Sequence, residues 1–411
     1  MTAKTEAARA MAVTLEDIRK AREVIKPAIL PTDMSLSLSA SKLLGCQVYF
    51  KYENQQATGS FKLRGAFNKI SSLTADEKKR GVVASSAGNH AQGVALSATR
   101  AGVKSTVVMP LNASLVKVQA TRDYGAEVIL HGEIYDEAFE YAKELEKKHG
   151  YTFVHPYEDP LIIAGQGTIG LEILEKIPHL ESVVIPIGGG GLISGIATAV
   201  KAINPKCKIY GVQSNQAPGM EKLFHKDSPM DSKKRISTIA DGIAIKRPSP
   251  VMYENFISKL VDDIFTVTDD EIAEAIVFLL ERAKTVVEGS GAAGMAAVMN
   301  RKMNLGAHSC VLLCGGNIDL NIIAKVVNKG LIRKGRLAEL SVIVDDLPGN
   351  LNRLTKTIAD LGGNVLEVKH DRVSAGLSLR ETKIDFTLET TSVDHAQAIR
   401  EAITALGSRI V

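Results

Sequence analysis

Lys62 is the first residue of this 411-residue chain whose type and setting suggest chemistry. It lies in the segment GSFKLRG, after a Thr-Gly-Ser turn and at the expected start of a helix. Lysine is disfavoured there, because the N-terminal end of a helix dipole is positive. The same positive end favours an unprotonated amine, which a lysine needs to form an imine. An isolated lysine in a first turn is more often a surface residue, so this segment needs support from others.

A second segment, SSAGNHAQG, begins at Ser85 and follows a short apolar strand. Small residues form its turn, and a helix is expected to start at its Asn-His pair. Free backbone N–H groups at such a helix start bind anions such as a carboxylate. An ordinary strand-to-helix turn with Ser and Asn as caps explains the pattern equally well.

The third segment, GGGGL, follows the apolar strand SVVIPI and begins at Gly188. Consecutive glycines cost conformational entropy when they are ordered, but they let a backbone wrap closely around an anion. A flexible linker would not stand between a buried strand and an apolar helix, so a phosphate cradle is favoured. The glycine spacing does not fit a dinucleotide-binding fingerprint, and no GK[ST] follows it, so a P-loop is not expected.

The fourth segment, CGGN, begins at Cys314 at the end of an apolar strand. A buried structural cysteine and a polar group facing a ring nitrogen are equally good explanations. Together, the four segments match what pyridoxal phosphate needs: an imine-forming lysine, a phosphate site, a partner for the pyridine nitrogen and a site for the substrate carboxylate.

These segments must be positioned by an alternation of short apolar strands and helices, which predicts a parallel α/β fold. A helix with an N-terminal capping box is expected over 14–25. The expected strands are 46–52, 81–85, 105–109, 127–130, 182–187, 208–213 and 310–314, and the other expected helices are one from near residue 60 and those over 115–124, 269–283 and 290–299.

The pattern changes near residue 330. Strands over 340–344, 364–370, 378–388 and 409–411 and helices over 350–361 and 396–406 give the order βαββαβ, typical of a ferredoxin-like domain. We therefore expect a catalytic domain over 1–330, with a smaller subdomain over about 53–157 inserted in it. A linker is expected over 331–336 and a second domain over 337–411.

Composition excludes several classes of protein. Hydrophobic residues make up 45% of the chain and charged residues 23%, as in a folded protein. The net charge is only +4 and no long basic run occurs, so nucleic acid is not an expected partner. We see neither a secretion signal nor a membrane-length apolar run. The four cysteines lack a complete metal motif. These features favour a cytoplasmic protein without a metal site.

The segments SFKLRGA, SSAGNHAQG, GGGGL and CGGN, in this order, resemble the fold-type II pyridoxal-phosphate enzymes. Within them the chain is most similar to the branch of threonine ammonia-lyases (threonine dehydratases) and serine racemases. The tail, with DDLPGNLNRL and GGNVLEV, resembles an ACT domain, a ligand-binding regulator. The resemblance implies two α/β subdomains of the tryptophan synthase β type, followed by a ferredoxin-like ACT domain.

The resemblance also implies roles for individual residues. Lys62 would hold the cofactor covalently and act as the catalytic base. The ring of the cofactor would meet Phe61, Asn89 (at its hydroxyl) and Cys314 (at its nitrogen), and the phosphate would be held by Gly188, Gly189, Gly190, Gly191 and Leu192. The substrate carboxylate would be received by Ser86, Gly88, Asn89 and His90, and an effector would bind near Leu347, Pro348, Gly349 and Asn350. Gly242, in ADGIA, would form part of the wall facing the cofactor.

Two departures from the serine racemases favour elimination over racemisation. Their second serine in the SSGNH turn is replaced here by Ala87, and their acidic metal-binding segment is replaced by QSNQ over 213–216. The implied reaction is conversion of L-threonine to 2-oxobutanoate and ammonia, and of L-serine to pyruvate. The alternatives are a serine racemase or serine dehydratase, and a non-catalytic sensor. The implied effector is isoleucine, valine or AMP, and the implied assembly is a homotetramer.

Overall fold

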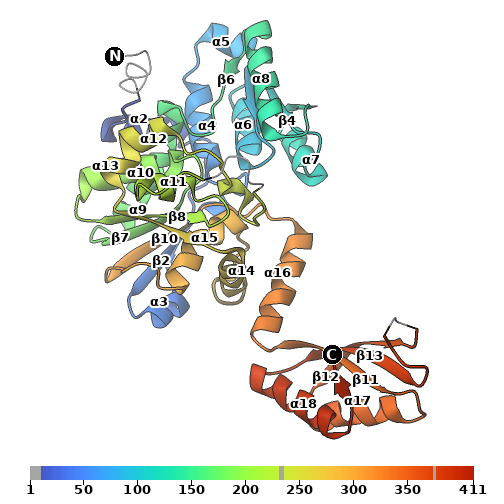
Figure 1. The fold of residues 1–411 in the computed structure, drawn as a ribbon. Helices are drawn as coiled ribbons and strands as arrows, with labels where there is room; N and C mark the ends of the chain where they lie inside the picture. The colour runs from blue at the N-terminus through green and yellow to red at the C-terminus, as the bar shows by residue number, and fades with distance from the viewer. Residues whose placement is uncertain (1–10, 231–235, 374–375) are drawn as a thin grey trace. The chain divides into compact units, whose positions relative to one another are not determined.

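The computed structural model describes residues 11–230, 236–373 and 376–411 (Figure 1). The chain divides after Ile318 into two compact units. In the described residues, no helix is both long enough and apolar enough to span a bilayer.

The first unit contains two sheets, which include the strands expected in the first domain. The larger sheet has the spatial order β1 (Met34–Leu36), β2 (Gln47–Tyr52), β10 (His308–Leu313), β7 (Ser182–Pro186), β8 (Lys208–Ser214) and β9 (Asp263–Val267). The smaller sheet has the order β5 (Glu127–Leu130), β4 (Ser105–Met109), β3 (Val82–Ser85) and β6 (Thr152–Phe153). All pairs are parallel except β1 with β2. Parallel strands place their carboxyl ends along one edge, where ligand sites of open α/β sheets lie.

Helices connect and cover these strands. They are α2 (Leu15–Ile25), α3 (Leu38–Leu44), α4 (Lys62–Ser71), α5 (Ala75–Arg80), α6 (Asn89–Arg100), α7 (Leu115–Asp123), α8 (Tyr135–His149), α9 (Pro160–Lys176), α10 (Gly191–Ile203), α11 (Gly219–Phe224), α12 (Pro250–Met252), α13 (Ser258–Leu260), α14 (Asp269–Phe278) and α15 (Gly289–Met299). Shorter helical turns are η1 (Glu53–Gln55), η2 (Asp241–Ile243), η3 (Tyr253–Ile257) and η4 (Leu279–Ala283). The helix expected over 269–283 is therefore α14 followed by η4, where the turns widen to π-helical geometry.

The capping box expected at the start of α2 is present. The Thr14 hydroxyl accepts a hydrogen bond from the Asp17 backbone N–H, and the Asp17 carboxylate accepts one from the Thr14 backbone N–H. Both satisfy N–H groups that the helix start leaves without partners.

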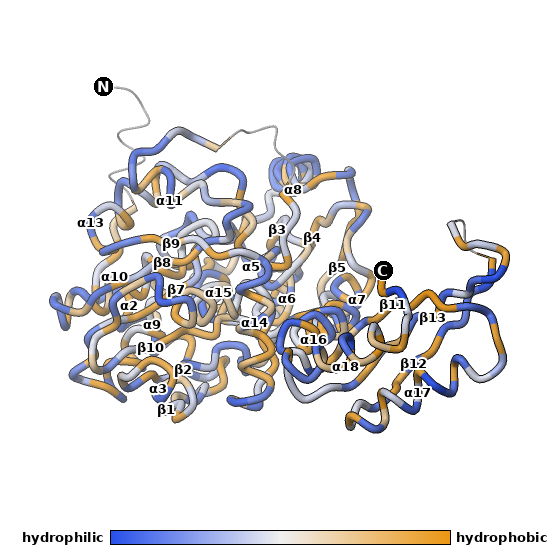
Figure 2. Tube along the Cα trace, turned by 60° about the horizontal axis from the view of Figure 1, so that its bottom comes forward, coloured by the Kyte–Doolittle hydropathy of each residue, from blue (hydrophilic) through white to orange (hydrophobic). Residues whose placement is uncertain are grey.

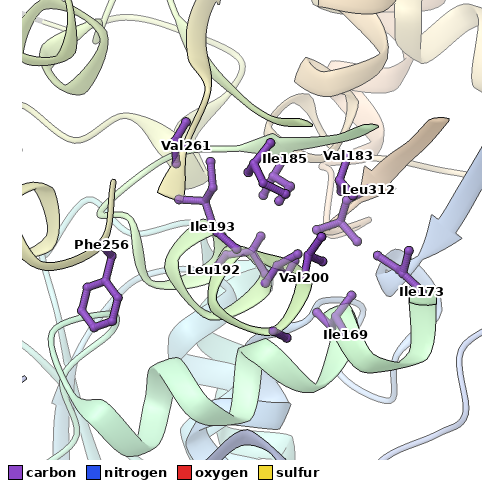
Figure 3. Close-up of a cluster of buried hydrophobic side chains, with 14 of the residues drawn as sticks. Ile169, Ile173, Val183, Ile185, Leu192, Ile193, Val200, Phe256, Val261 and Leu312 are labelled. Atoms are coloured by element: carbon purple, nitrogen blue, oxygen red, sulfur yellow. The ribbon is translucent and has the colours of Figure 1, made fainter. Parts of the chain in front are cut away.

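The main core lies between the larger sheet and α9 and α10. Ile169 and Ile173 of α9 and Ile193 of α10 point at Val183 and Ile185 of the sheet (Figure 3). Each such side chain stabilises the fold by about 2 kcal/mol when it is removed from water. This packing fixes α10, and therefore the glycine loop before it, against the end of β7.

The second unit consists of α16 (Leu320–Arg333), β11 (Leu337–Asp345), α17 (Asn350–Asp360), β12 (Asn364–Asp371), β13 (Glu381–Glu389), α18 (Val393–Ala405) and β14 (Arg409–Ile410). Its four strands form an antiparallel sheet in the order β12-β13-β11-β14, and after α16 the elements follow the expected βαββαβ order. Leucine, valine and isoleucine side chains of the strands pack with Phe386 against α17 and α18.

The boundary before this sheet differs from expectation. Helix α16, which carries both hydrophilic and hydrophobic residues (Figure 2), continues to Arg333, so residues 331–333 are helical. Strand β11 begins at Leu337 and not at Leu340, because its buried alternation extends to Ala338. Strand β13 begins only at Glu381.

Candidate active site

A cavity of about 960 Å³ opens where β3, β7 and β10 end and α4, α6 and α10 begin. It gathers every residue proposed for catalysis, cofactor and substrate: Phe61, Lys62, Ser86, Gly88, Asn89, His90, Gly188, Gly189, Gly190, Gly191, Leu192 and Cys314. Ala87 and Gly242 line it as well. The proposed effector residues belong to the second unit: Leu347, Pro348 and Gly349 lie in the turn before α17, and Asn350 is its first residue.

Lys62 is the first residue of α4, as the sequence predicts. Its Nζ donates a hydrogen bond to the Pro156 carbonyl at 3.0 Å. Burial lowers the pKa of Lys62 to about 8, although Cys314 and Glu288 oppose the shift. The preceding turn is attached to the end of β10 because the Phe61 N–H donates to the Cys314 carbonyl at 3.2 Å. Lys62 is therefore an amine that is held in place by a hydrogen bond and loses its proton near pH 8, well below the pH at which an ordinary lysine does.

The turn between β3 and α6 carries the proposed carboxylate site. The Ser86 hydroxyl accepts a hydrogen bond from the Gly88 N–H at 3.2 Å, which leaves its O–H to donate to a ligand. His90 Nε2 lies 2.8 Å from the Val154 carbonyl and must donate to it. Burial, and then Lys62, lower the pKa of His90 to about 3. The neutral ring has no second N–H, so His90 can receive a carboxylate only through its backbone.

Asn89 lies between two polar groups that the sequence analysis did not assign. Its Nδ2 donates to Glu288 Oε1 at 2.7 Å, and its Oδ1 accepts from Asn317 Nδ2 at 2.8 Å. Asn317 is the last residue of CGGN, and Glu288 precedes α15. The amide of Asn89 is therefore fixed in orientation at the cavity wall.

The glycine loop is shaped by close neighbours. A Cβ on Gly189 would lie 2.2 Å from the ring of Tyr157, and one on Gly188 would lie 3.2 Å from the Gly242 carbonyl. Gly190 has a φ of 101°, a backbone conformation that residues with a side chain rarely adopt. Because α10 begins at Gly191, its first N–H groups have no acceptor inside the helix, and the residues that carry them line the cavity. This is the cradle that a phosphate requires.

Cys314 follows β10 and is buried. Burial and the neighbouring Glu288 raise the pKa of its thiol, so the group stays neutral. The thiol lies 3.7 Å from the Ser290 carbonyl. Among the described residues, the buried Ser290 hydroxyl has no hydrogen-bond partner, and it lines the same cavity. An unsatisfied buried hydroxyl next to a neutral thiol fits a wall that receives a polar ring.

A second polar cluster lies behind the first turn of α4. Arg64, fully buried, donates two hydrogen bonds to Glu53 (2.8 and 2.7 Å) and two to Glu172 (2.5 and 2.9 Å). It also donates to Thr168 Oγ1 at 3.1 Å, and Lys51 Nζ lies 2.7 Å from Glu172. Burial alone would lower the pKa of Arg64, but the two carboxylates raise it above its usual value. Two cations and two anions balance in this cluster.

The residues at the cavity fit pyridoxal phosphate. The partly buried amine of Lys62 and the glycine loop before α10 line the same cavity. Its wall also carries the Asn89 amide, the neutral Cys314 thiol and the Ser290 hydroxyl, which has no partner among the described residues.

Comparison with known proteins supports the same cofactor. Residues 25–315 match the family described as "Pyridoxal-phosphate dependent enzyme". An L-threonine ammonia-lyase of Thermotoga maritima is 46% identical over 398 residues, which are 97% of this chain and 99% of the relative. The chain belongs to the threonine ammonia-lyase family. It is a pyridoxal-phosphate-dependent lyase of the α/β fold-type II class, as the four segments predicted.

Two further matches are a threonine dehydratase and a serine racemase. The catabolic L-threonine dehydratase TdcB of Staphylococcus aureus is 47% identical over 325 residues, 78% of this chain and 93% of the relative. The solved structure of maize serine racemase superposes with a TM-score of 0.73 at 33% identity, covering 78% of this chain and 99% of that one. The second unit lies outside the matched residues 25–315.

Sequence reasoning missed several groups of this threonine ammonia-lyase family member. Glu288, Ser290, His155 and Tyr157 line the cavity, but only the first had a signal: a lone acid between two valines and a run of small residues. Such a setting predicts burial, and a buried acid just before a helix that lines the cavity is a candidate for chemistry. Outside the cavity, Glu221, His225 and Asp227 come close enough to share a cation, but they lie at the surface beside α11.

Proposed function

We propose that the protein converts L-threonine to 2-oxobutanoate and ammonia, and L-serine to pyruvate. The observation that carries this proposal is the amine of Lys62, with its pKa lowered to about 8, in the same cavity as the glycine loop. The identity to the Thermotoga L-threonine ammonia-lyase over nearly the full length supports the choice of threonine.

Several residues of the cavity would bind the cofactor, and one of them would also transfer a proton. When bound, pyridoxal phosphate supplies an aldehyde that links to an amino group and a ring that withdraws electrons from the α-carbon. The first N–H groups of α10 would hold its phosphate, Cys314 would face its ring nitrogen, and Asn89 would donate to its ring hydroxyl. Lys62 Nζ would first hold the cofactor and, once displaced by substrate, take the proton from the α-carbon.

The substrate carboxylate would bind at the start of α6. The Ser86 O–H and the first backbone N–H groups of α6 are the donors there, and the helix dipole adds to the attraction. Binding of the carboxylate at this helix start would hold the α-carbon near Lys62. One orientation of the substrate would then serve both removal of the α-proton and departure of the β-hydroxyl.

The assay for this proposal measures keto-acid release from L-threonine and L-serine by the loaded protein. Lys62→Ala should lower the rate roughly a thousandfold or more, because both cofactor attachment and the base are lost. Equal rates for the wild type and Lys62→Ala would refute the role of Lys62. The absence of keto acid from both substrates would leave a non-catalytic sensor as the function.

A serine racemase is the second candidate, because the maize enzyme shares the fold at a TM-score of 0.73. Ala87 lines the cavity where a racemase needs a second acid or base, and an alanine can supply neither. Chiral analysis of L-serine reactions distinguishes the two: D-serine forming faster than pyruvate would favour the racemase.

We also propose that the second unit is an ACT domain which binds isoleucine, valine or AMP near Leu347–Asn350 and controls a cytoplasmic homotetramer. The βαββαβ order supports it, as does the turn before α17, where Leu347 is 62% exposed and Gly349 has a φ of 91°. Calorimetry on the full chain with each of the three ligands tests the effector site. Sedimentation tests the tetramer.

A further inference from the structure

Glu288 is a buried acid in the cavity to which the proposed mechanism gives no task. Its side chain is 5% exposed and lines the cavity just before α15. The backbone around it is fitted closely, because its N–H donates to the Gly315 carbonyl at 3.0 Å. A Cβ on Gly315 would lie 2.3 Å from Glu288 Oε1, so a glycine is needed there for the carboxylate to fit.

A directed chain of hydrogen bonds ends at this carboxylate. The Thr58 backbone carbonyl can only accept, so Asn317 Nδ2, 2.8 Å away, must donate to it. The same Nδ2 lies 2.8 Å from Asn89 Oδ1, which is thereby the acceptor, and Asn89 Nδ2 must point to Glu288 Oε1 at 2.7 Å. An amide nitrogen carries two hydrogens. Glu288 uses one, and the other is available to the cavity.

The groups facing Glu288 come from four elements and have both signs of charge: Lys62 of α4, Lys117 of α7, Asp241 of η2 and the Cys314 thiol after β10. Burial and then Asp241 raise the pKa of Glu288 to about 7, while the Asn89 hydrogen bond, Lys117 and the Asn317 backbone N–H lower it. Lys117 and Asp241 pair with each other at 2.6 Å.

We propose that Glu288 is a positioning residue for the cofactor. It holds Asn89 so that an amide N–H, and not the amide oxygen, meets the ring hydroxyl, and its own charge alters how readily that hydroxyl ionises. A negative Glu288 disfavours a second negative charge on the ring oxygen, and a protonated Glu288 does not. This inference rests on the proposed placement of Asn89 at the cofactor, and it is independent of the amino-acid substrate.

The test is the visible absorption of the loaded protein, recorded between pH 5.5 and about 8.5 without any amino acid. Glu288→Gln keeps an oxygen that accepts from Asn89 and removes the charge. We expect the absorption of the wild type to change near neutral pH, as Glu288 gains or loses its proton. In Glu288→Gln this change should be lost. The cofactor should stay on Lys62, as borohydride trapping and mass spectrometry would show. Glu288→Ala also loses the acceptor, and should hold the cofactor about tenfold more weakly, the value of one hydrogen bond.

Two neighbouring charges give a matched pair that does not alter Glu288 itself. Asp241→Asn should shift the midpoint of the absorption change to lower pH, and Lys117→Gln should shift it to higher pH. This pair decides the matter if Glu288→Gln does not fold. A Glu288→Gln protein that changes colour at the wild-type midpoint would overturn the proposal, as would an unmoved midpoint in both neighbouring variants.

The outcome is separable from that of the proposed function. A wild-type protein with the expected absorption change but without keto-acid release from threonine would refute the function and leave Glu288 in its role. Threonine turnover together with a wild-type absorption change in Glu288→Gln would do the reverse.

Discussion

The first turn of α4 places two basic side chains in different surroundings, one paired with carboxylates and the other at the cavity. Lys62 and Arg64 are two residues apart, which turns their side chains by about 200° around the helix axis. Arg64 meets two carboxylates through four hydrogen bonds. Lys62 donates to a backbone carbonyl and faces the cavity, where Glu288 is held by an amide.

This difference separates stability from reactivity. The pKa of Arg64 moves away from neutral pH, because its charge is fully paired. The pKa values of Lys62 and Glu288 move toward neutral pH, to about 8 and about 7, because burial dominates at both. Groups that must exchange protons are those whose burial is only partly compensated. The paired cluster can hold the helix without taking part in the chemistry.

The largest effect is expected for Arg64→Met, which tests whether the paired cluster stabilises the fold. It leaves the fully buried Glu53 without a cation and the partly buried Glu172 with Lys51 alone, and we expect a loss of about 3–5 kcal/mol in the free energy of unfolding, measured with urea. Adding Glu53→Leu should recover part of the loss, because one unpaired charge is removed as well. A loss under about 1 kcal/mol in the single variant would show that the cluster contributes little.

The second prediction concerns the other side of the helix, in protein freed of its cofactor. The pKa of Lys62 is about 8 in the fold against 10.5 in the unfolded chain, so below pH 8 the buried charge opposes folding. Lys62→Met should therefore raise the free energy of unfolding at pH 7 by up to about 3 kcal/mol.

That gain should shrink between pH 8 and 10.5, where the unfolded wild-type chain binds more protons than the folded one and the wild type becomes more stable. Urea unfolding of both proteins at several pH values measures it. A gain that does not depend on pH would mean that methionine packs better, and that burial of the charge is not the cause.

The smallest expected effect is at a surface contact distant in sequence from both clusters. Thr14→Ala removes the acceptor for the Asp17 N–H at the start of α2 and should cost about 1 kcal/mol of stability. The absorption of the bound cofactor should not change. A larger loss, or an altered spectrum, would show that α2 is coupled to the cavity.

Local patterns were sufficient to predict the elements that carry the site. Lys62 at the start of a helix, the four glycines between a strand and a helix, and the strand before Cys314 are each signalled within about ten residues of sequence. The apolar strands were predicted well, because a buried parallel strand reads as a short continuous apolar run.

Other parts depend on contacts between distant segments. Helix α9 is buried on nearly all sides, so it has no polar face to reveal its period. The Asn317–Asn89–Glu288 chain joins residues up to 228 positions apart. The ion cluster likewise joins Arg64 to Glu172, 108 positions away. Only the fold places these groups together.

The hydrogen-bond chain at the cavity starts from the backbone carbonyl of Thr58. This affects which positions of the chain can change in evolution. Every amino acid brings the same carbonyl, so a codon change at position 58 leaves the first acceptor in place. The orientation of the amides beyond it can be lost only by altering the amides themselves or by redirecting the main chain. A residue that fits the buried space of Thr58 should therefore leave the chain of hydrogen bonds intact, whereas replacing either amide, at position 89 or 317, should break it.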